Sequence, residues 1–449
     1  MELLAQIPII GGTLAVVLPF LVVLSIVVFV HEYGHYMVGR WCGIKAEVFS
    51  IGFGKVLWKW TDRRGTSWQV AALPLGGFVR FVGDMDPASA GRGDDEKLSP
   101  EERKAAFHNA GLLRRTLTVA AGPCANFLLS VVIFTGIVLS VGQPSGDPVI
   151  GSFGTEEVED VGFEIGDRVL SISGREVETF ADILNIMART SGDRQSAVVE
   201  RGGDVRQITV RYHRVPRIQE VTPGMPAARA GMMPGDVFVS IDGEPVTSYR
   251  ALQLIVADKP HGAEIEVVIE REGEDEHLVF RFVPELIVRQ HPETDEHVLL
   301  PTLGIRGSAL GGFEPRREMV PIYRAVPIGV SETWRIISGT MIYIGDMVFK
   351  GADTSQLGGP IRIAEISGDA ARKGFSQFVW LIALLSTSIG LINLFPIPIL
   401  DGGHLMFYAV ELVRGRPVGQ AWMRVGTMIG LSLVLLLMVF ATYNDLVRL

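Results

Sequence analysis

Three residues near the start of the chain have the types and the spacing for chemistry on a metal ion: His31, Glu32 and His35, in the order His-Glu-x-x-His. On a helix, residues four apart lie on one face, so both imidazoles can bind one ion while the carboxylate lies beside the water that the ion binds. This is the arrangement of zinc hydrolases. Two structural histidines are the alternative, although with 9 His in 449 residues the motif arises by chance in only roughly 1% of such chains.

The elements that must position this motif are long uncharged segments. Four of them have about 20 residues or more, enough for a helix to cross a hydrocarbon layer about 30 Å thick: residues 7–30, 116–146, 374–400 and 425–444. We therefore predict four transmembrane helices. A buried helix of a soluble domain is the alternative, above all for the third segment. His31 directly follows the first segment, and ionisable residues at membrane depth persist mainly where they have a function.

The distribution of charge predicts the topology. Residues 31–115 are rich in Lys and Arg, whereas Glu2 is the only charged residue before the first apolar segment. The positive-inside rule makes residues 31–115 cytoplasmic, and alternation then places residues 147–373 and the C-terminus outside. The first and third helices run in the same direction, so Asp401 at the end of the third segment lies at the depth of His31 and is the predicted third ligand. His404 is a rival ligand or a partner of one, and a helix-capping role is the alternative for Asp401.

Glycines interrupt the chain around and within the membrane segments. Residues 41–84 alternate apolar residues with Gly and Pro, which predicts short β-hairpins at the membrane whose edge can pair with an extended substrate. A packing role alone is the alternative.

Ser99, Pro100 and Glu102 form a capping-box pattern that predicts a short helix. The segment Gly122-Pro123-Cys124-Ala125-Asn126 puts a helix breaker and an amide into the second apolar run, where it either lines the site or only kinks the helix.

The outer segment contains an internal repeat. Residues 162–177 align without gaps on residues 231–246, and both copies contain a Gly-Asp turn followed by a strand. This pattern predicts two small domains that resemble PDZ domains, which bind extended chains by strand addition; a spacer without a ligand is the alternative. Residues 321–348 follow the spacing of an amphipathic helix on the membrane surface.

Composition excludes other classes of protein. The net charge of −9 and the lack of a basic patch indicate no nucleic-acid partner. The two cysteines, Cys42 and Cys124, do not support a disulfide framework. The first apolar segment has no basic residue before it and no cleavage pattern, so we expect a retained membrane helix and not a signal peptide.

These motifs, in this order, resemble the site-2 protease family of intramembrane zinc metalloproteases. The resemblance rests on His-Glu-x-x-His in the first membrane helix, Gly122-Pro123-x-x-Asn126, and the stretch from Asn393 to Asp401 that ends in Leu-Asp-Gly. The fold expected is a multi-pass α-helical membrane protein with four transmembrane helices, a membrane-associated β-hairpin region and two extracytoplasmic PDZ-like α+β domains. The expected parts are residues 1–146, the PDZ-like domains 147–219 and 220–310, a linker with an amphipathic helix 311–373, and the C-terminal membrane part 374–449.

The resemblance implies an endopeptidase with Zn²⁺ as cofactor, His31, His35 and Asp401 as ligands and Glu32 as general base. It implies cleavage of single-pass membrane proteins, namely an anti-sigma factor and signal-peptide remnants, after an earlier cut on the outer side. The enzyme would lie among the lipids of the bacterial inner membrane, with periplasmic PDZ-like domains that act as a size filter. The substrate-binding residues that it implies are Asn393, Pro396, Pro398, Asn126, Gly76 and Gly77.

Two other hypotheses fit parts of the sequence. A catalytically silent, membrane-anchored PDZ scaffold would keep the repeat but would have no need for Glu32 between the histidines. A metal transporter would use His and Asp within the membrane, although it would scatter polar residues along several helices. The substitution Glu32→Gln separates the first from a protease, and metal flux in liposomes separates the second.

Overall fold

The computed structural model describes residues 11–83, 99–153, 162–189, 194–211, 216–222, 225–246, 249–260, 262–274, 276–290, 297–307, 313–350 and 358–448. Contacts divide the chain into two compact units. The first, here called the membrane unit, comprises Met1–Ser140 and Val320–Leu446. The second, the sheet unit, comprises Val141–Met319 and Val447–Leu449. Each unit is described by itself.

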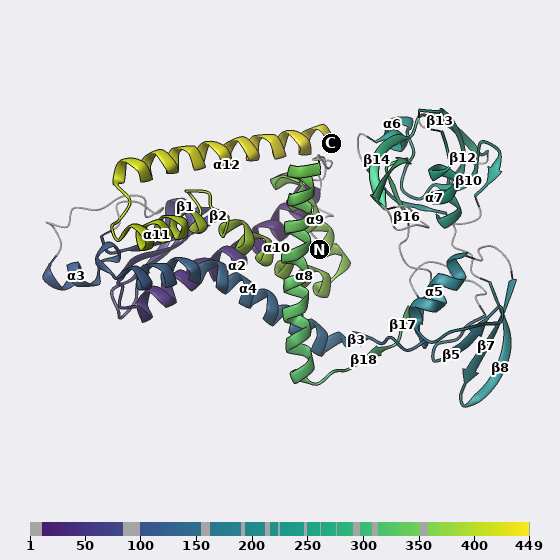
Figure 1. Ribbon diagram of the computed structural model, residues 1–449, viewed down its shortest axis with the longest axis horizontal. Coiled ribbons are helices and arrows are strands. Elements are labelled where there is room, and N and C mark those ends of the chain that lie inside the picture. Colours follow the sequence, from purple (N-terminus) through teal and green to yellow (C-terminus); the bar gives the residue numbers. More distant parts are fainter. Residues whose placement is uncertain are drawn as a thin grey trace. The chain divides into compact units, whose positions relative to one another are not determined.

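The membrane unit contains the predicted membrane helices. Within the described residues, four helices are long and apolar enough to cross a membrane: α2 (Gly11–Trp41), α4 (Leu112–Val141), α10 (Phe375–Asn393) and α12 (Gln420–Arg448). Figure 1 shows α2, α4, α10 and α12 as the long helices of this unit, together with α8. The number predicted from the sequence is therefore confirmed.

Helix α2 runs through the histidine motif to Trp41, so His31 and His35 lie on the first membrane helix, as their spacing predicted. The predicted end of the third membrane helix was wrong. Helix α10 ends at Asn393 and not at residue 400, because Pro396 and Pro398 cannot continue a helix. A separate helix, α11 (Asp401–Arg414), then begins at Asp401.

Small residues let α2 and α4 approach closely beside the site. A Cβ atom on Gly34 of α2 would lie 2.5 Å from the Ala121 carbonyl oxygen and 2.7 Å from Ala125 Cβ. Further along the helices, Val23, Val27 and Ile382 form a buried cluster that joins α2 to α10. Close backbone contact through small residues is the usual way in which helices pack in membranes. The geometry of the motif on α2 is therefore fixed by its neighbours.

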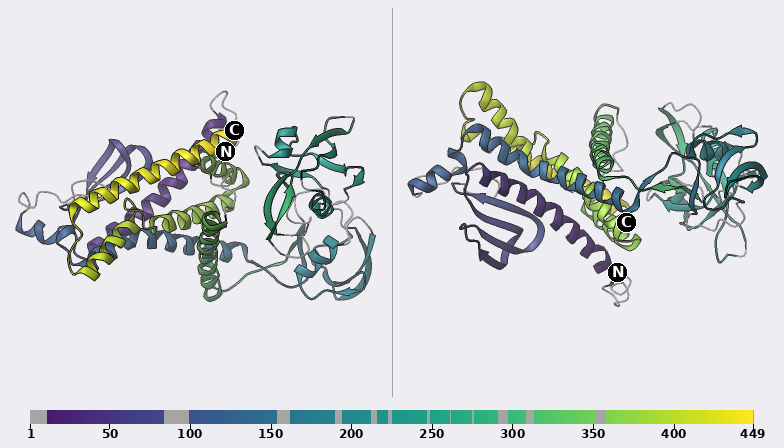
Figure 2. Two further views of the ribbon diagram at one scale, coloured as in Figure 1. Left: turned by 45° about the horizontal axis from the view of Figure 1, so that its top comes forward. Right: turned by 90° about the horizontal axis from the view of Figure 1, so that it is seen from below.

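Two long strands pack beside α2. Strands β1 (Ala46–Thr61) and β2 (Ser67–Phe81) pair with each other, where the sequence predicted several shorter hairpins. The first part of β1 lies between two parts of β2, and residues 77–81 form an outer edge of the sheet among the described residues. Phe49 of β1 stacks on Trp68 of β2 and meets Tyr36 of α2. Figure 2 shows these strands alongside α2.

Shorter elements complete the membrane unit. The capping box predicted at Ser99 and Glu102 is present and begins α3 (Pro100–Ala105), which a 3-10 helix, η2 (Phe107–Asn109), follows. Helix α8 (Ile322–Lys350) matches the predicted amphipathic helix. Helix α9 (Pro360–Lys373) was not predicted; Gly359 is its N-cap and Pro360 its first residue.

The sheet unit repeats one arrangement twice. Its two four-stranded sheets have the orders β6-β5-β7-β8 and β11-β10-β12-β13. The strands of the first sheet are β5 (Arg168–Ile172), β6 (Arg175–Glu176), β7 (Arg194–Arg201) and β8 (Asp204–Arg211). Those of the second are β10 (Val237–Ile241), β11 (Glu244–Pro245), β12 (Ile265–Glu270) and β13 (Leu278–Phe282). Helices α5 (Phe180–Arg189), α6 (Pro226–Ala230) and α7 (Tyr249–Ala257) accompany them.

The repeat extends to individual contacts. Asp167 accepts hydrogen bonds from Arg201 Nε at 2.7 Å and Nη2 at 2.8 Å. In the second copy, Asp236 accepts the same two bonds from Arg271 at 2.7 and 2.8 Å. Both aspartates are buried, and each sheet has its own apolar core. The internal repeat inferred from the sequence is thus a repeat of structure.

Paired short strands complete the sheet unit. The pairs are β3 (Gln143–Pro144) with β18 (Arg317–Glu318), β4 (Ile150–Phe153) with β17 (Phe313–Pro315), β9 (Ile218–Val221) with β16 (Ile305–Gly307), and β14 (Glu285–Gln290) with β15 (His297–Thr302). Ile218 belongs to the core of the second copy, just before the boundary predicted after residue 219. The pair of β3 with β18 brings together the segments that enter and leave the unit.

Candidate metal centre

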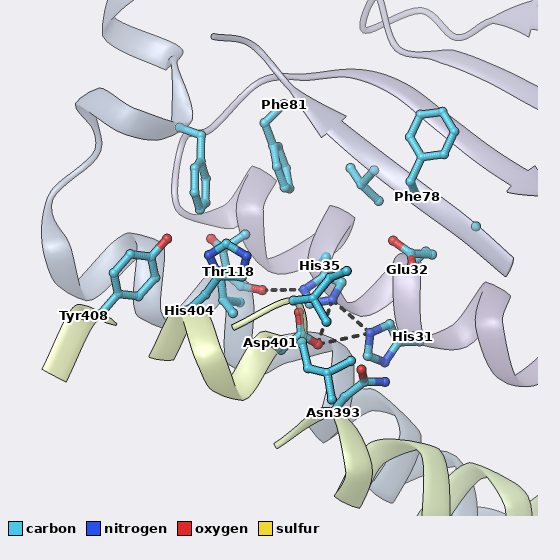
Figure 3. Close-up of a pocket in the computed structure, with 16 residues that line it drawn as sticks. His31, Glu32, His35, Phe78, Phe81, Thr118, Asn393, Asp401, His404 and Tyr408 are labelled. Atoms are coloured by element: carbon cyan, nitrogen blue, oxygen red, sulfur yellow. Dashed lines mark hydrogen bonds and ion pairs between the residues drawn. The ribbon is translucent and has the colours of Figure 1, made fainter. Parts of the chain in front are cut away.

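Three potential ligand atoms converge where α2 meets the start of α11. His31 Nε2 lies 3.1 Å and His35 Nε2 lies 3.4 Å from Asp401 Oδ2, and the two nitrogens lie 3.2 Å apart. Figure 3 shows the three side chains pointing toward one another from the two helices. They form a group with the composition and spacing to hold a metal ion. The sequence prediction that Asp401 lies at the depth of the histidines therefore agrees with the geometry.

The protonation of His35 follows from its second ring nitrogen. Its Nδ1 lies 2.9 Å from the Thr118 carbonyl oxygen of α4. A carbonyl oxygen only accepts, so Nδ1 carries a proton, and the neutral form of this ring presents the lone pair of Nε2 to Asp401. Asp401 Oδ2 is buried, and within the described part of the chain it has no polar partner besides the two histidines.

Such a set of atoms fits a cation. Lone pairs and a carboxylate that face one another in a buried place repel unless a positive charge lies between them. Tetrahedral zinc with bonds of about 2.0–2.1 Å separates its ligand atoms by about 3.3–3.4 Å. The separations of 3.1–3.4 Å among these three atoms are close to that spacing.

Gly122 of α4 leaves room beside the ligand atoms. A Cβ atom at this position would lie 2.2 Å from His35 Nε2 and 2.9 Å from His31 Cε1. Any side chain on residue 122 would therefore push the imidazoles out of place. Of the two interpretations of the glycine-proline motif, the structure supports a position beside the site for Gly122.

A cavity of about 200 Å³ opens onto the three atoms. Glu32 lines it, and the backbone N–H of Val79 on the edge of β2 donates to the Glu32 carboxylate. Gly77 keeps that edge close to α2, because a Cβ atom there would lie 3.1 Å from Glu32 Cγ and 2.8 Å from the Ser50 carbonyl oxygen. In Figure 3, Glu32 lies between the ligand histidines and the strand that carries Phe78. The Glu32 carboxylate, the three potential ligand atoms and the edge of β2 thus line one cavity.

The sequence profile of Peptidase family M50 matches residues 19–437. The chain belongs to peptidase family M50. A protein named as a zinc metalloprotease in Agrobacterium fabrum is 39% identical over 437 residues, which cover 96% of this chain and 95% of that one. The Regulator of sigma-E protease RseP of Salmonella typhimurium is 30% identical over 469 residues, covering 96% of this chain and 98% of its own. Protease RseP of Yersinia pestis is 32% identical over 459 residues, which cover 96% of this chain and 98% of that one.

These similarities confirm the resemblance inferred from the motifs. The M50 chain is a membrane-embedded, site-2 type zinc metalloprotease. Membership of this peptidase family decides against the hypotheses of a silent PDZ scaffold and of a metal transporter. Among solved structures, the PDZ domain of the SdrC-like protein from Listeria monocytogenes is 20% identical and covers 22% of this chain and 92% of that one, with a TM-score of 0.18. At this TM-score the similarity assigns no fold, and the two PDZ-like domains of this M50 chain stay a prediction.

The residues predicted to bind substrate in this M50 protease lie in different surroundings. Gly77 and Asn393 line the cavity. Gly76 instead makes room for the Phe53 ring, since a Cβ atom there would lie 2.3 Å from Phe53 Cε2. Pro396 is exposed.

The other two predicted substrate residues face protein. Pro398 contacts α12, where a Cβ atom on Gly430 would lie 3.2 Å from Pro398 Cδ. Asn126 is fully buried beside His31. A substrate contact for any of the six residues remains a prediction.

Sequence reasoning missed several residues of the cavity. Thr118 acts through its backbone carbonyl, which leaves no signature in a sequence. Phe81, Phe107 and Tyr408 also line the cavity and come from three elements far apart in the chain. The rival ligand His404 lines the cavity, but the group that could hold a metal comprises His31, His35 and Asp401.

Proposed function

We propose that this protease hydrolyses peptide bonds in or near the membrane segment of single-pass membrane proteins in the bacterial inner membrane. Its ligands for zinc would be His31, His35 and Asp401. The observation that carries the proposal is the convergence of these three side chains beside Glu32, in one cavity at the ends of candidate membrane helices. An anti-sigma factor and signal-peptide remnants, after an earlier cut on the outer side, are the substrates we infer from the RseP relatives.

The chain's own residues supply proton transfer and orientation. When bound, zinc is a Lewis acid that makes water acidic enough to lose a proton near neutral pH. Glu32 takes this proton as general base and returns it to the leaving amine. Thr118 holds the His35 ring, so that its Nε2 lone pair stays directed at the ion.

The edge of β2 is suited to present a substrate to this site. The carbonyl groups of a helical substrate are held in intrahelical hydrogen bonds, so hydrolysis requires local unwinding. Residues 77–81 pair with β1 on one side and line the cavity with Gly77, Phe78 and Val79 on the other. An unwound segment can form strand hydrogen bonds there in place of its helical ones. In this proposal the hairpin is the membrane-associated β region.

The two sheets of the other unit act in this proposal as periplasmic PDZ-like domains. Their repeated order and their matching Asp–Arg pairs support two domains of one kind. They would exclude substrates that still carry a bulky outer domain.

The test is cleavage of a single-pass substrate by the full chain in liposomes, with zinc content measured on the same samples. Glu32→Gln should retain one zinc per chain and lose at least about 10²-fold in rate, because general acid–base catalysis contributes about that much or more. Asp401→Asn should lose zinc and activity together. Wild-type cleavage rates for Glu32→Gln would contradict the proposed mechanism.

The size filter needs a separate comparison. The wild-type chain should cut a substrate without its outer domain at least about tenfold faster than the intact substrate, a difference of about 1.4 kcal/mol. A matched substrate whose outer domain is released by an added protease during the assay is the control. Equal rates for intact and trimmed substrate would rule out the filter while leaving the catalytic assignment intact.

A further inference from the structure

Asn126 lies against His31, whereas the Thr118 carbonyl oxygen contacts the other histidine, His35. Its side chain is fully buried on α4, and its Nδ2 lies 3.2 Å from His31 Nδ1. The other amide atom, Oδ1, is buried and has no hydrogen-bond partner among the residues that the structure describes. The mechanism above gives this amide no role, so one buried polar atom next to a candidate ligand lacks an explanation.

The chemistry of His31 explains the unpaired Oδ1 atom of Asn126. A histidine that binds a metal through Nε2 must carry its proton on Nδ1, which then needs an acceptor. An amide NH₂ cannot accept, but a half-turn about the Cβ–Cγ bond exchanges Nδ2 and Oδ1 with little other movement. Oδ1 then accepts from Nδ1–H, and the orphaned oxygen gains a partner. His35 already has the equivalent arrangement through the Thr118 carbonyl oxygen.

Contacts from α4 and α10 hold Asn126 in this position. Its backbone carbonyl oxygen accepts from Ser386 Oγ at 2.9 Å and from Ser130 Oγ at 3.0 Å. Gly390 of α10 leaves room for it, since a Cβ atom there would lie 3.1 Å from Asn126 Cβ. The backbone is thus fixed, and the amide remains the part that can adapt to His31.

We propose that Asn126 is a positioning residue that selects the tautomer of His31 by accepting a hydrogen bond from its Nδ1–H, and so raises zinc affinity. This inference rests on the ligand set of the proposed function. The two histidines would then be oriented from one helix in different ways, His35 by a backbone carbonyl and His31 by a side chain. Of these two contacts, a substitution can remove only the side-chain contact of Asn126 with His31.

The experiment measures zinc affinity of the full chain in detergent by competition with a chelator, without substrate. Asn126→Leu, which has similar size and no acceptor, should bind zinc about 10–100-fold more weakly, the usual effect of losing such a partner. Asn126→Asp keeps an acceptor and should stay within about threefold of wild type. Thr135→Val is the matched control, because Thr135 is another buried polar residue of α4 whose Oγ1 has no partner; its affinity should equal that of wild type.

Two results would overturn the inference: unchanged zinc affinity in Asn126→Leu, or equal losses in Asn126→Leu and Asn126→Asp. Nitrogen NMR of ring-labelled histidine in the zinc-loaded wild type tests it without any variant. It should show a proton on Nδ1 of His31, and a proton-free Nδ1 would overturn it as well. Asp401→Asn is measured beside these samples, because retained zinc in that variant would contradict the ligand set itself.

Discussion

The imidazole rings of His31 and His35 lie against Gly122 of α4, and the space there is smaller than a methyl group. A Cβ atom 2.2 Å from His35 Nε2 cannot be accommodated without displacing the ring. Gly122→Ala should therefore leave the chain folded but reduce zinc content below about one tenth, since ligand geometry must be kept within about 0.5 Å.

Metal analysis and cleavage assays check this prediction against Gly136→Ala. Gly136 lies on the same helix, and no atom of the described residues lies within 4 Å of its added Cβ atom. This control should keep wild-type zinc and activity. If both variants retain zinc equally, the steric explanation for Gly122 is wrong.

At the level of residues, side-chain chemistry was predictable and backbone chemistry was not. His31, Glu32 and His35 have a helical spacing that specifies one face, and the charge topology put Asp401 at the same depth. The acceptor of His35 is a carbonyl, which every residue has, so no sequence pattern marks Thr118. The contact of Asn126 with His31 depends on how α2 and α4 cross.

Helix α11 carries Asp401, so its attachment to α4 determines where the proposed third ligand lies. Glu411 of α11 accepts hydrogen bonds from Arg115 Nη2 at 2.6 Å and Nη1 at 3.3 Å, and the Arg115 guanidinium lies over the Tyr408 ring at 5.0 Å. The two charged side chains are only 14% and 15% exposed. The pair therefore ties the helix of the ligand to the helix of Gly122.

Removing one member should loosen this attachment by about 1–3 kcal/mol, because the remaining charged group is then mostly buried without its partner. Glu411→Gln and Arg115→Met should each lower zinc affinity, and the double variant should lose less than the sum of the two. The coupling expected is about 0.5–3 kcal/mol. Asp369→Asn, in an exposed ion pair of α9, is the control; additive effects at 115 and 411 would exclude the coupling.

At the level of elements, strongly apolar or strongly patterned segments were predicted and short polar helices were not. The uncharged segment 374–400 was interpreted as one helix, which hid the turn at Pro396 and Pro398 and the start of α11. The long β strands were interpreted as several hairpins, because Gly52 and Gly54 resemble turn residues. In the structure these glycines adopt positive φ within β1 and bend it.

On the scale of the whole molecule, the sheet unit has cores and ion pairs of its own. Burial alone would raise the pKa of Asp167, but hydrogen bonds from Arg201 and from the Glu164 N–H outweigh burial and hold this pKa below its ordinary value. The stability that this carboxylate contributes is therefore fully present above the unfolded pKa of about 4 and is lost as the pH falls through the lower folded pKa.

Amide hydrogen exchange of β5 and β7, corrected for intrinsic rates, should thus show weaker protection at about pH 3 than at pH 6 in the wild type. Asp167→Asn should be weakly protected at both values. Zinc content should not change in this variant, because the ligand cluster lies in the membrane unit. A variant with the same pH dependence as the wild type would show that another group causes the loss of protection.

The division into two units was partly accessible from the sequence. The matching residues 162–177 and 231–246 predicted a duplication, and the structure repeats even the Asp–Arg pairs, whose arginines lie outside the alignment. The short strands that close the unit, such as β3 and β18, could not be predicted. They join segments about 170 residues apart in the chain, and such pairing has no local signal.

The wide separation of the ligands along the chain has a consequence for biosynthesis. Asp401 follows His35 by 366 residues, the difference between 401 and 35. At roughly 5–20 residues per second, a ribosome needs about 20–70 s to travel this distance. During that time the histidines and Glu32 are already made, while the aspartate is not. A nascent chain therefore cannot complete the proposed ligand set before the last part of the membrane unit is made.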